Sequence, residues 1–175
     1  MITRRDFCRW GTDVLGGLFA LGLAVPGIAY LLSPLRGRSE AGEYYPLARL
    51  SDLTVGVPRG FSILEDWQDA WVTYPREPVG SIWLVRQSEG AQGPVIAYTA
   101  ECPHLGCAIT LAAGGRSFFC PCHQSRFDLQ GRPMNAVPPR GMDRLDVQLS
   151  ADPDPEIRVK FQRFRSTSQE KIPLV

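Results

Sequence analysis

The chain has 175 residues, of which 19 are lysine or arginine and 18 are aspartate or glutamate, so its formal net charge is only +1. This balance, without a basic stripe in the sequence, argues against nucleic acid as a partner. The sequence contains 17 glycines and 15 prolines, as loop-rich β proteins often do, and it has no Walker loop or dinucleotide-binding fingerprint.

Residues 1–12 are predicted to be the basic end of an export signal. The run Thr3-Arg4-Arg5-Asp6-Phe7 is similar to a twin-arginine signal, a route that exports folded proteins with their cofactors in place. The same arginines would also serve as the cytoplasmic end of an ordinary anchor.

Residues 13–33 predict a transmembrane anchor. No charged residue occurs in residues 14–32, a length close to the roughly 20 residues that span a bilayer. Gly27-Ile28-Ala29 offers a small-residue cleavage site, but the long apolar run favours an uncleaved anchor. The arginines before it indicate a single-pass protein of a bacterial cytoplasmic membrane with its head on the periplasmic side.

Residues 34–46 are polar, contain glycine and proline, and predict a flexible linker. Residues 47–165 predict one all-β head of short strands, without a helical period. The apolar run 82–85 indicates a strand buried on both faces. Residues 166–175 show no pattern and are expected to be a tail or a contact with partner subunits. The expected strands are residues 54–57, 61–64, 70–74, 81–86, 95–99, 108–111, 116–119, 126–129, 145–149 and 156–161.

Two short segments hold both histidines and four of the five cysteines of the chain. They read Cys102-Pro103-His104-Leu105-Gly106-Cys107 and Cys120-Pro121-Cys122-His123. Such a concentration of thiolates and imidazoles indicates a metal site. A C-x-H and a C-x-x-H spacing together fit a tetrahedral zinc. They also fit a two-iron two-sulfur centre with both thiolates on one iron and both imidazoles on the other.

Cys107 and Cys122 are left as a spare pair, one in each segment. Zinc has no use for this pair, whereas a disulfide would hold two loops closed over a cluster. At this point the sequence closely resembles the Rieske iron–sulfur proteins of quinol-oxidising cytochrome complexes, whose loops read C-x-H-x-G-C and C-P-C-H-x-S. The resemblance implies one 2Fe-2S cluster and a Cys107–Cys122 disulfide. The cluster ligands that it implies are Cys102, His104, Cys120 and His123.

The resemblance also implies an antiparallel β head with a small cluster-binding lobe at about residues 100–140. Pro138 and Pro139 fall in the family's loop that covers the cluster. Ser125 matches a serine that donates a hydrogen bond to a bridging sulfide and raises the potential. Phe127 stands where many high-potential members have tyrosine, and Gln124 replaces a usual glycine. The missing tyrosine hydroxyl predicts a lower potential, which would suit menaquinol.

The function implied by the resemblance is electron transfer in a quinol–cytochrome c oxidoreductase, as a subunit that is not catalytic alone. Its partners would be a cytochrome b subunit, a c-type cytochrome acceptor and quinol. His104 or His123 would meet the quinol, since reduction makes a ligand imidazole more basic and couples electron uptake to proton uptake. The linker would let the head move between quinol site and acceptor haem, or would serve only as a spacer.

Three other classes share the ligand motif. Ring-hydroxylating oxygenases need two further histidines for a second iron, and this chain has none left. Soluble Rieske ferredoxins normally lack the disulfide cysteines and an anchor. The small subunit of arsenite oxidase is the alternative function, because it often carries the run Ser125-Arg126-Phe127-Asp128 after the second loop.

Overall fold

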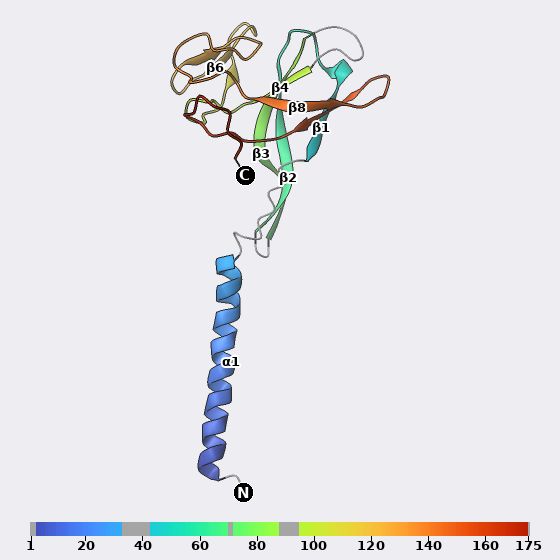
Figure 1. The fold of residues 1–175 in the computed structure, drawn as a ribbon. Helices are drawn as coiled ribbons and strands as arrows, with labels where there is room; N and C mark the ends of the chain where they lie inside the picture. The colour runs from blue at the N-terminus through green and yellow to red at the C-terminus, as the bar shows by residue number, and fades with distance from the viewer. Residues whose placement is uncertain (1–2, 33–42, 70–71, 88–94, 175) are drawn as a thin grey trace. The chain divides into compact units, whose positions relative to one another are not determined.

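The computed structural model of the chain describes residues 3–32, 43–69, 72–87 and 95–174 (Figure 1). The chain divides into two compact units, Met1–Ser39 and Glu40–Val175. The first contains one long helix and the second a head of β-strands, so the predicted fold class is confirmed. Most of the predicted linker lies outside the described residues.

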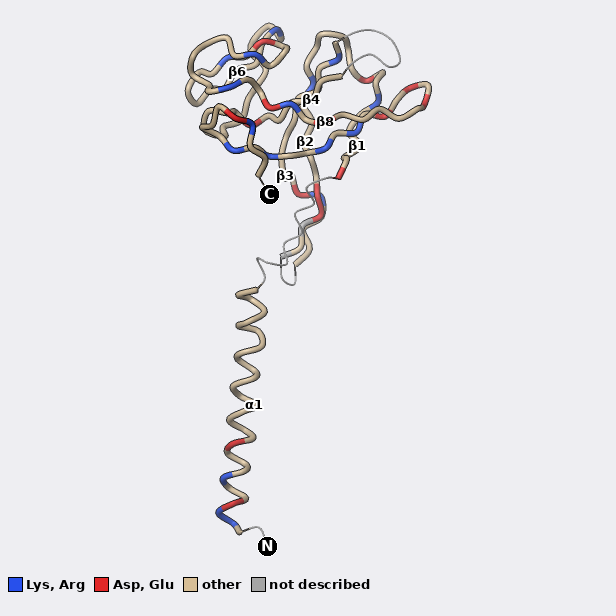
Figure 2. Tube along the Cα trace, viewed as in Figure 1, with Lys and Arg blue, Asp and Glu red and all other residues tan. Residues whose placement is uncertain are grey.

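Helix α1, Arg4–Leu32, has 29 residues and a mean hydropathy of 2.0 over its most apolar window. Its first turn is capped because the Thr3 hydroxyl accepts from the Asp6 backbone N–H at 3.2 Å and donates to the Asp6 carboxylate at 2.5 Å. Charged residues occur only near its N-terminal end (Figure 2). At 1.5 Å per residue the helix is about 43 Å long, enough to cross a hydrocarbon core of about 30 Å.

The head contains a large and a small antiparallel sheet. The six-stranded sheet has the order β1-β9-β8-β4-β3-β2, and the three-stranded sheet has the order β5-β6-β7. β8 joins the two halves of the large sheet: Arg144 and Leu145 pair with β4, and the residues from Asp146 onward pair with β9. The strands are β1 Tyr44–Arg49, β2 Arg59–Asp69, β3 Val72–Arg86, β4 Val95–Thr99, β5 Thr110–Leu111, β6 Phe118–Cys120, β7 Ser125–Phe127, β8 Arg144–Leu149 and β9 Glu156–Lys160.

Strand β3 separates two hydrophobic cores. Ile82 and Leu84 are fully buried in the core of the large sheet. Val85 is fully buried in a second core, against which Trp83 packs. Alternate side chains of a strand point to opposite faces, so the continuous apolar run contributes to both cores. The sequence prediction of a strand buried on both faces is confirmed.

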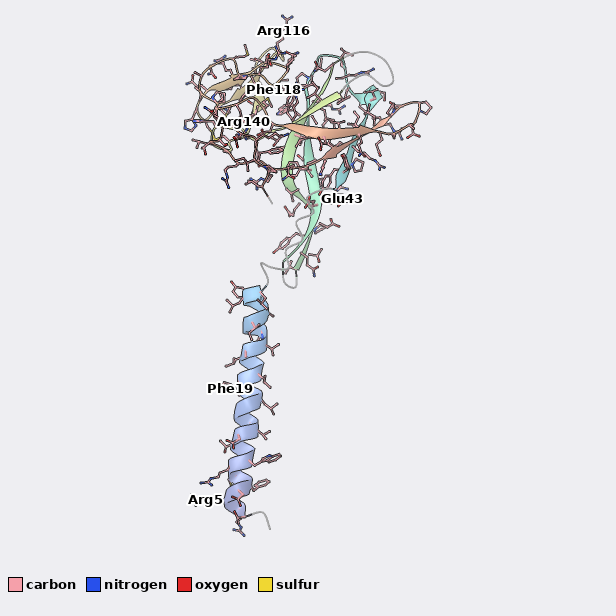
Figure 3. All side chains as sticks on the ribbon, viewed as in Figure 1. Arg5, Phe19, Glu43, Arg116, Phe118 and Arg140 are labelled. Carbon is pink, nitrogen blue, oxygen red and sulfur yellow. A yellow bond between two sulfur atoms is a disulfide. The ribbon has the colours of Figure 1, made fainter. Side chains whose placement is uncertain are left out.

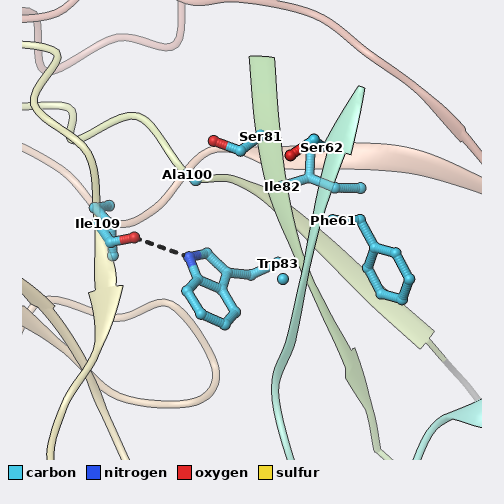
Figure 4. Close-up of a pocket in the computed structure, with 8 residues that line it drawn as sticks. Phe61, Ser62, Ser81, Ile82, Trp83, Ala100 and Ile109 are labelled. Atoms are coloured by element: carbon cyan, nitrogen blue, oxygen red, sulfur yellow. Dashed lines mark hydrogen bonds between the residues drawn. The ribbon is translucent and has the colours of Figure 1, made fainter. Parts of the chain in front are cut away.

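The second core lies under the small sheet and includes both cysteines that the motif assigns as ligands, Cys102 and Cys120. The indole N–H of Trp83 donates to the carbonyl of Ile109 at 3.0 Å, which ties the large sheet to the chain entering β5 (Figure 4). The ring of Trp83 also lies 5.5 Å from that of Phe118, a residue within the packed side chains of the head (Figure 3). The small lobe is therefore fixed to its base by both polar and apolar contacts.

Several expected strand boundaries were wrong. Residues 54–57 contain only an isolated bridge from Val55 to Arg86, because Gly56 adopts a φ of 73° and turns the chain. The segments 70–74 and 81–86 were expected as separate strands, but Val72–Arg86 is continuous and pairs along β2 with two irregularities in register. Residues 70–71 lie outside the described residues.

Both ends of the predicted head also needed correction. Tyr44, Tyr45 and Pro46 were assigned to the linker but belong to β1, where they pair with β9. The expected tail from residue 166 folds back on the head: Pro173 bridges Phe164, and Thr167 donates its N–H to the Pro103 carbonyl at 2.9 Å. Backbone hydrogen bonds of this kind leave no periodic signal in the side chains, which is why the sequence did not reveal them.

Candidate metal centre

The first ligand segment is a tight loop between β4 and β5. The Cys102 N–H donates to the Cys107 carbonyl and the Gly106 N–H donates to the Cys102 carbonyl, both at 2.8 Å. Gly106 has a φ of 75°, a left-handed conformation that glycine adopts without a steric cost. The loop therefore closes on itself and presents His104 and Leu105 at its outer side, where Leu105 is 52% exposed.

The second ligand segment is the turn that joins β6 to β7, with Cys120 and Ser125 paired across its base. Gln124 has a φ of 63°, so the position that the family fills with glycine is left-handed here as well. Asn135 supports this turn: its amide group donates to the Gln124 carbonyl at 2.8 Å, and its side-chain oxygen accepts from the Arg126 N–H at 3.2 Å. No motif in the sequence indicates this role for Asn135.

A disulfide between Cys107 and Cys122 joins the two loops, with the Cα atoms 6.5 Å apart. This prediction is confirmed. The sulfur atoms of Cys107, Cys120 and Cys122 lie within 4.8 Å of one another. Because two of them are oxidised to the disulfide, only Cys120 of this group offers a thiolate to a metal. The disulfide thus lies directly beside the candidate centre.

The four expected ligands converge from the two loops. Cys102 and Cys120 are each 1% exposed, whereas His104 is half-buried and His123 is exposed. The two imidazole rings lie edge to face with their centroids 4.8 Å apart. Two buried cysteines and two imidazoles nearer the surface are a donor set that would hold a two-iron centre, with Cys102 and Cys120 on one iron and His104 and His123 on the other.

The Cys102 thiol and the Ser125 hydroxyl are buried next to each other at the centre. Burial raises the pKa of the Cys102 thiol, while the His104 backbone N–H and the Ser125 hydroxyl act in the opposite direction. The Ser125 hydroxyl is fully buried and, within the described ranges, has no hydrogen-bond partner of ordinary geometry. A buried hydroxyl without an acceptor is costly, and a bridging sulfide beside Cys102 would supply one. The donor set and this hydroxyl therefore fit a 2Fe-2S cluster.

Phe127 and the proline loop complete the surroundings of the site. Phe127 is fully buried in the same core as Cys102 and Cys120. Pro138 is buried and Pro139 half-buried. The loop that they form continues into Arg140, whose guanidinium makes a bidentate ion pair with the buried Asp143 at 2.9 and 2.7 Å. The sequence analysis did not predict this ion pair beside the proline loop.

Comparison with known proteins identifies the family. The model of the Rieske [2Fe-2S] domain matches residues 43–147, more than half of the chain. The chain belongs to the Rieske family. Its cofactor is one 2Fe-2S cluster of the Rieske type, which removes the zinc alternative.

Relatives of this Rieske protein include the menaquinol:cytochrome c reductase iron-sulfur subunit of Geobacillus thermodenitrificans. The two are 27% identical over 152 residues, which cover 85% of this chain and 86% of the relative. The cytochrome b6-f complex iron-sulfur subunit of Chlorobaculum thiosulfatiphilum is 24% identical over 149 residues, covering 85% and 72%. These relatives confirm the predicted resemblance to Rieske proteins of quinol-oxidising cytochrome complexes.

Among solved structures, the plasma membrane Rieske protein from Synechocystis PCC 6803 matches with a TM-score of 0.38 and 26% identity. The match covers 51% of this chain and 85% of that one.

Proposed function

We propose that this Rieske protein is the electron-transfer subunit of a menaquinol–cytochrome c oxidoreductase. In this role it takes an electron and the coupled proton from quinol and passes the electron to a c-type cytochrome. The observation that carries the proposal is the pair of imidazoles, 4.8 Å apart at the surface, above two buried cysteines. The names of the two menaquinol:cytochrome c reductase relatives support it, as does a match that covers at least 79% of each chain.

The proposed ligands are Cys102, His104, Cys120 and His123. When bound, the cluster supplies a one-electron acceptor, with a potential in the range of about −150 to +300 mV for this class. The buried cysteines keep water away from the sulfur side, and the cross-linked loops hold both imidazoles in place.

His123 is the imidazole that we assign to the quinol, because it is exposed while His104 is half-buried. Its outward ring nitrogen would accept a hydrogen bond from the quinol hydroxyl and then hold the proton. The exposed Leu105 side chain offers an apolar surface on the neighbouring loop, and the quinol ring would pack against it. The chain has no second redox group in this scheme, so it acts only with its partners.

The absence of a hydroxyl at Phe127 is one reason to assign menaquinol, rather than a quinol of higher potential, as the electron donor. The Phe127 ring offers no hydroxyl to the sulfurs of the core that it shares with Cys102 and Cys120. A cluster with fewer hydrogen bonds to its sulfurs has a lower potential, and a lower potential suits a more reducing quinol. The menaquinol in the names of two relatives points in the same direction.

Helix α1 makes the chain a membrane-anchored subunit. We place the head on the periplasmic side, because Arg4, Arg5 and Arg9 precede the apolar run and a disulfide persists outside the cytoplasm. Export through the twin-arginine route would deliver the head with its cluster assembled. The linker before β1, most of which lies outside the described residues, would let the head approach first the quinol site and then the acceptor haem.

Purification of the tagged chain in mild detergent, followed by a reduced-minus-oxidised haem spectrum, tests this function. Stoichiometric b-type and c-type haems are expected, from a cytochrome b subunit and a c-type cytochrome. Molybdenum without haem would instead show a subunit of arsenite oxidase, the alternative that Ser125-Arg126-Phe127-Asp128 left open, and would refute the proposed function.

A further inference from the structure

The last residues of the chain fold into a clasp, defined here as residues 163–174. The Arg165 N–H donates to the Ile172 carbonyl at 2.8 Å, and the Leu174 N–H donates to the Arg163 carbonyl at 2.9 Å. Phe164 is 9% exposed within the core of the large sheet, and the Lys171 ammonium lies 4.5 Å from the centroid of its ring. The clasp is therefore an ordered part of the head.

The clasp contacts the first ligand loop. The Thr167 N–H donates to the carbonyl of Pro103, the residue between the two proposed ligands Cys102 and His104, at 2.9 Å. Next to this contact, the Arg163 guanidinium pairs with the Glu101 carboxylate at 2.8 Å. The clasp thus holds the loop by its backbone at the point where the ligands attach.

Arg140 links the clasp to the proline loop. Its guanidinium donates to the Ser168 carbonyl at 2.5 Å, to the Arg165 carbonyl at 2.9 Å and to both carboxylate oxygens of Asp143. The Arg140 and Asp143 side chains are only 10% and 5% exposed. Asp143 also accepts the Thr99 N–H through its backbone carbonyl at 3.0 Å. A buried ion pair is costly unless its hydrogen bonds are all made, and here the Arg140 guanidinium makes them to the clasp and to Asp143. These contacts tie the clasp, the proline loop and the end of β4 to one another.

The backbone of the clasp is strained where it meets the loop. Thr167 has a φ of 64°, a left-handed conformation that is unusual for a β-branched residue. Such a conformation persists only where the surrounding structure determines it, and it is common at functional sites. Here two sets of contacts hold Thr167 in this conformation. Its N–H donates to the Pro103 carbonyl, and Arg140 donates to carbonyls on either side of it in the clasp.

We propose that the clasp, locked by Arg140, positions the first ligand loop and hence His104 relative to His123. Arg140 is then a positioning residue that acts on the cluster through Ser168, Thr167 and Pro103. The inference rests on the proposed ligand role of His104. Loosening the clasp would release the Pro103 carbonyl, and the cluster would show altered potential and faster loss.

The test uses the full chain in detergent with the double substitution Arg140→Met/Asp143→Leu. A single Arg140→Met change would leave the Asp143 charge buried without a partner, whereas the double change removes both charges and is often tolerated. The double variant should keep its fold, shift the midpoint potential of the cluster and change its EPR line shape. Cluster loss and exchange of the Thr167 amide should accelerate by about fivefold for each of the two lost carbonyl contacts.

The matched control is Glu156→Leu/Arg158→Met, which removes an ion pair of 2.8 Å on β9 at an exposed position. It should leave the potential, the EPR spectrum and the Thr167 exchange unchanged. If the Arg140→Met/Asp143→Leu double variant failed to fold, Arg140→Lys would serve instead. That substitution keeps a positive charge beside Asp143 but loses the bidentate contact of the guanidinium. It should shift the potential, the EPR spectrum and the exchange rate in the same direction, by smaller amounts.

A potential, spectrum and exchange rate equal to those of the wild type in the folded double variant, or in Arg140→Lys, would overturn the inference. Equal shifts in the control pair would also overturn it, because they would indicate a general loss of stability. None of these readouts needs quinol or haem. Shifts confined to the Arg140 variants in a chain that binds no cytochrome would therefore support the clasp and refute only the proposed function.

Discussion

The backbone conformation of Gln124, at the tip of the second ligand loop, lowers the stability of the folded chain. Its φ of 63° lies in the left-handed region, which costs a residue with a Cβ atom roughly 1–2 kcal/mol relative to glycine. The sequence showed that a usual glycine was replaced, but it could not show the reason. The Asn135 amide bound to the Gln124 carbonyl at 2.8 Å helps to hold the turn despite this cost.

Gln124→Gly should therefore raise the free energy of unfolding by up to about 1 kcal/mol, since the strain is relieved while the greater freedom of glycine in the unfolded chain offsets part of the gain. Urea denaturation of the two proteins measures this difference. The Asn135 contact uses the backbone carbonyl, so it remains in the variant. A variant less stable than the wild type would show that the Gln124 side chain makes a stabilising contact.

The buried hydroxyl of Ser125 is expected to tune the potential of the cluster. It is fully buried without an ordinary partner in the described part of the chain, and we expect it to donate to the cluster and stabilise the more negative reduced form. Ser125→Ala should lower the midpoint potential by about 40 mV, which corresponds to about 1 kcal/mol for one electron. Redox titration followed by circular dichroism measures the change.

Thr110→Val is the control for Ser125→Ala, because it also removes a hydroxyl from the small lobe, one that donates to the Phe119 carbonyl at 3.0 Å. Its potential should equal that of the wild type. Equal potentials for Ser125→Ala and the wild type would show that the hydroxyl does not reach the cluster.

Phe127→Tyr should raise the potential by a similar amount, about 40 mV for one new hydrogen bond to a ligand sulfur. The ring is fully buried in the core that holds Cys102 and Cys120, so the new hydroxyl must find a partner there. The same titration measures it. A wild-type midpoint already close to +300 mV would contradict the menaquinol assignment, and an unchanged potential in the variant would show that the hydroxyl lies away from the sulfurs.

Among the glycines of the described residues, Gly80 in β3 leaves the least space for a Cβ atom, because the ring of Phe161, which follows β9, packs over it. A Cβ atom at Gly80 would lie 2.1 Å from the ring of Phe161, whereas a Cβ atom at Gly60 in β2 would lie 3.4 Å or more from Trp83. Neither glycine has a positive φ. The two positions therefore differ mainly in the space that they leave for a side chain.

Gly80→Ala should lower the free energy of unfolding by about 1–3 kcal/mol, as overpacking in a core does. Gly60→Ala is the matched control, and it should change stability by less than about 1 kcal/mol or raise it, because alanine restricts the unfolded chain. Thermal unfolding of the full chain in detergent compares the two. Equal effects would mean that the Phe161 ring moves aside without cost.

Local apolar patterns predicted the strands that lie within the cores but not those formed by long-range pairing. β4 was predicted with the bounds that the structure has, 95–99, since its side chains alternate between the two cores. The middle of β3 is exposed and contains Pro75 and Pro78, so it resembles a turn in the sequence. Pairing with β2 keeps this stretch in the strand, with two irregularities in register and a left-handed φ of 55° at Arg76.

The same distinction applies to the site. The proposed ligands and the disulfide were found from two contiguous motifs, because short loops need their cysteines and histidines at fixed spacing. Asn135, Arg140 and Thr167 act through backbone carbonyls of distant segments. Such contacts accept many residue types on the receiving side, so no motif records them, and only the folded chain brings the partners together.

As a whole molecule, the chain combines a helix that can cross a membrane with a head that has its own cores. The proposed cluster ligands, the disulfide and the clasp all lie within the head. Because none of them involves helix α1, chemistry and anchoring should be separable. In the proposed function the helix only keeps the head near its partners, which raises the effective concentration of the head at the quinol site.

Removal of residues 1–42, which leaves β1 intact from Tyr44, tests this separation. The shortened chain should be soluble and should keep the midpoint potential and EPR spectrum of the full chain. Added to membranes that lack the full chain, at the concentration of the cytochrome b subunit, it should restore quinol–cytochrome c turnover poorly, because tethering typically contributes about 10²–10⁴-fold in apparent affinity.

Raising the concentration of the fragment should recover the rate if the helix is only a tether. Full turnover at equimolar fragment would show that the anchor is dispensable, and failure at any concentration would show that the helix itself takes part in assembly of the quinol site.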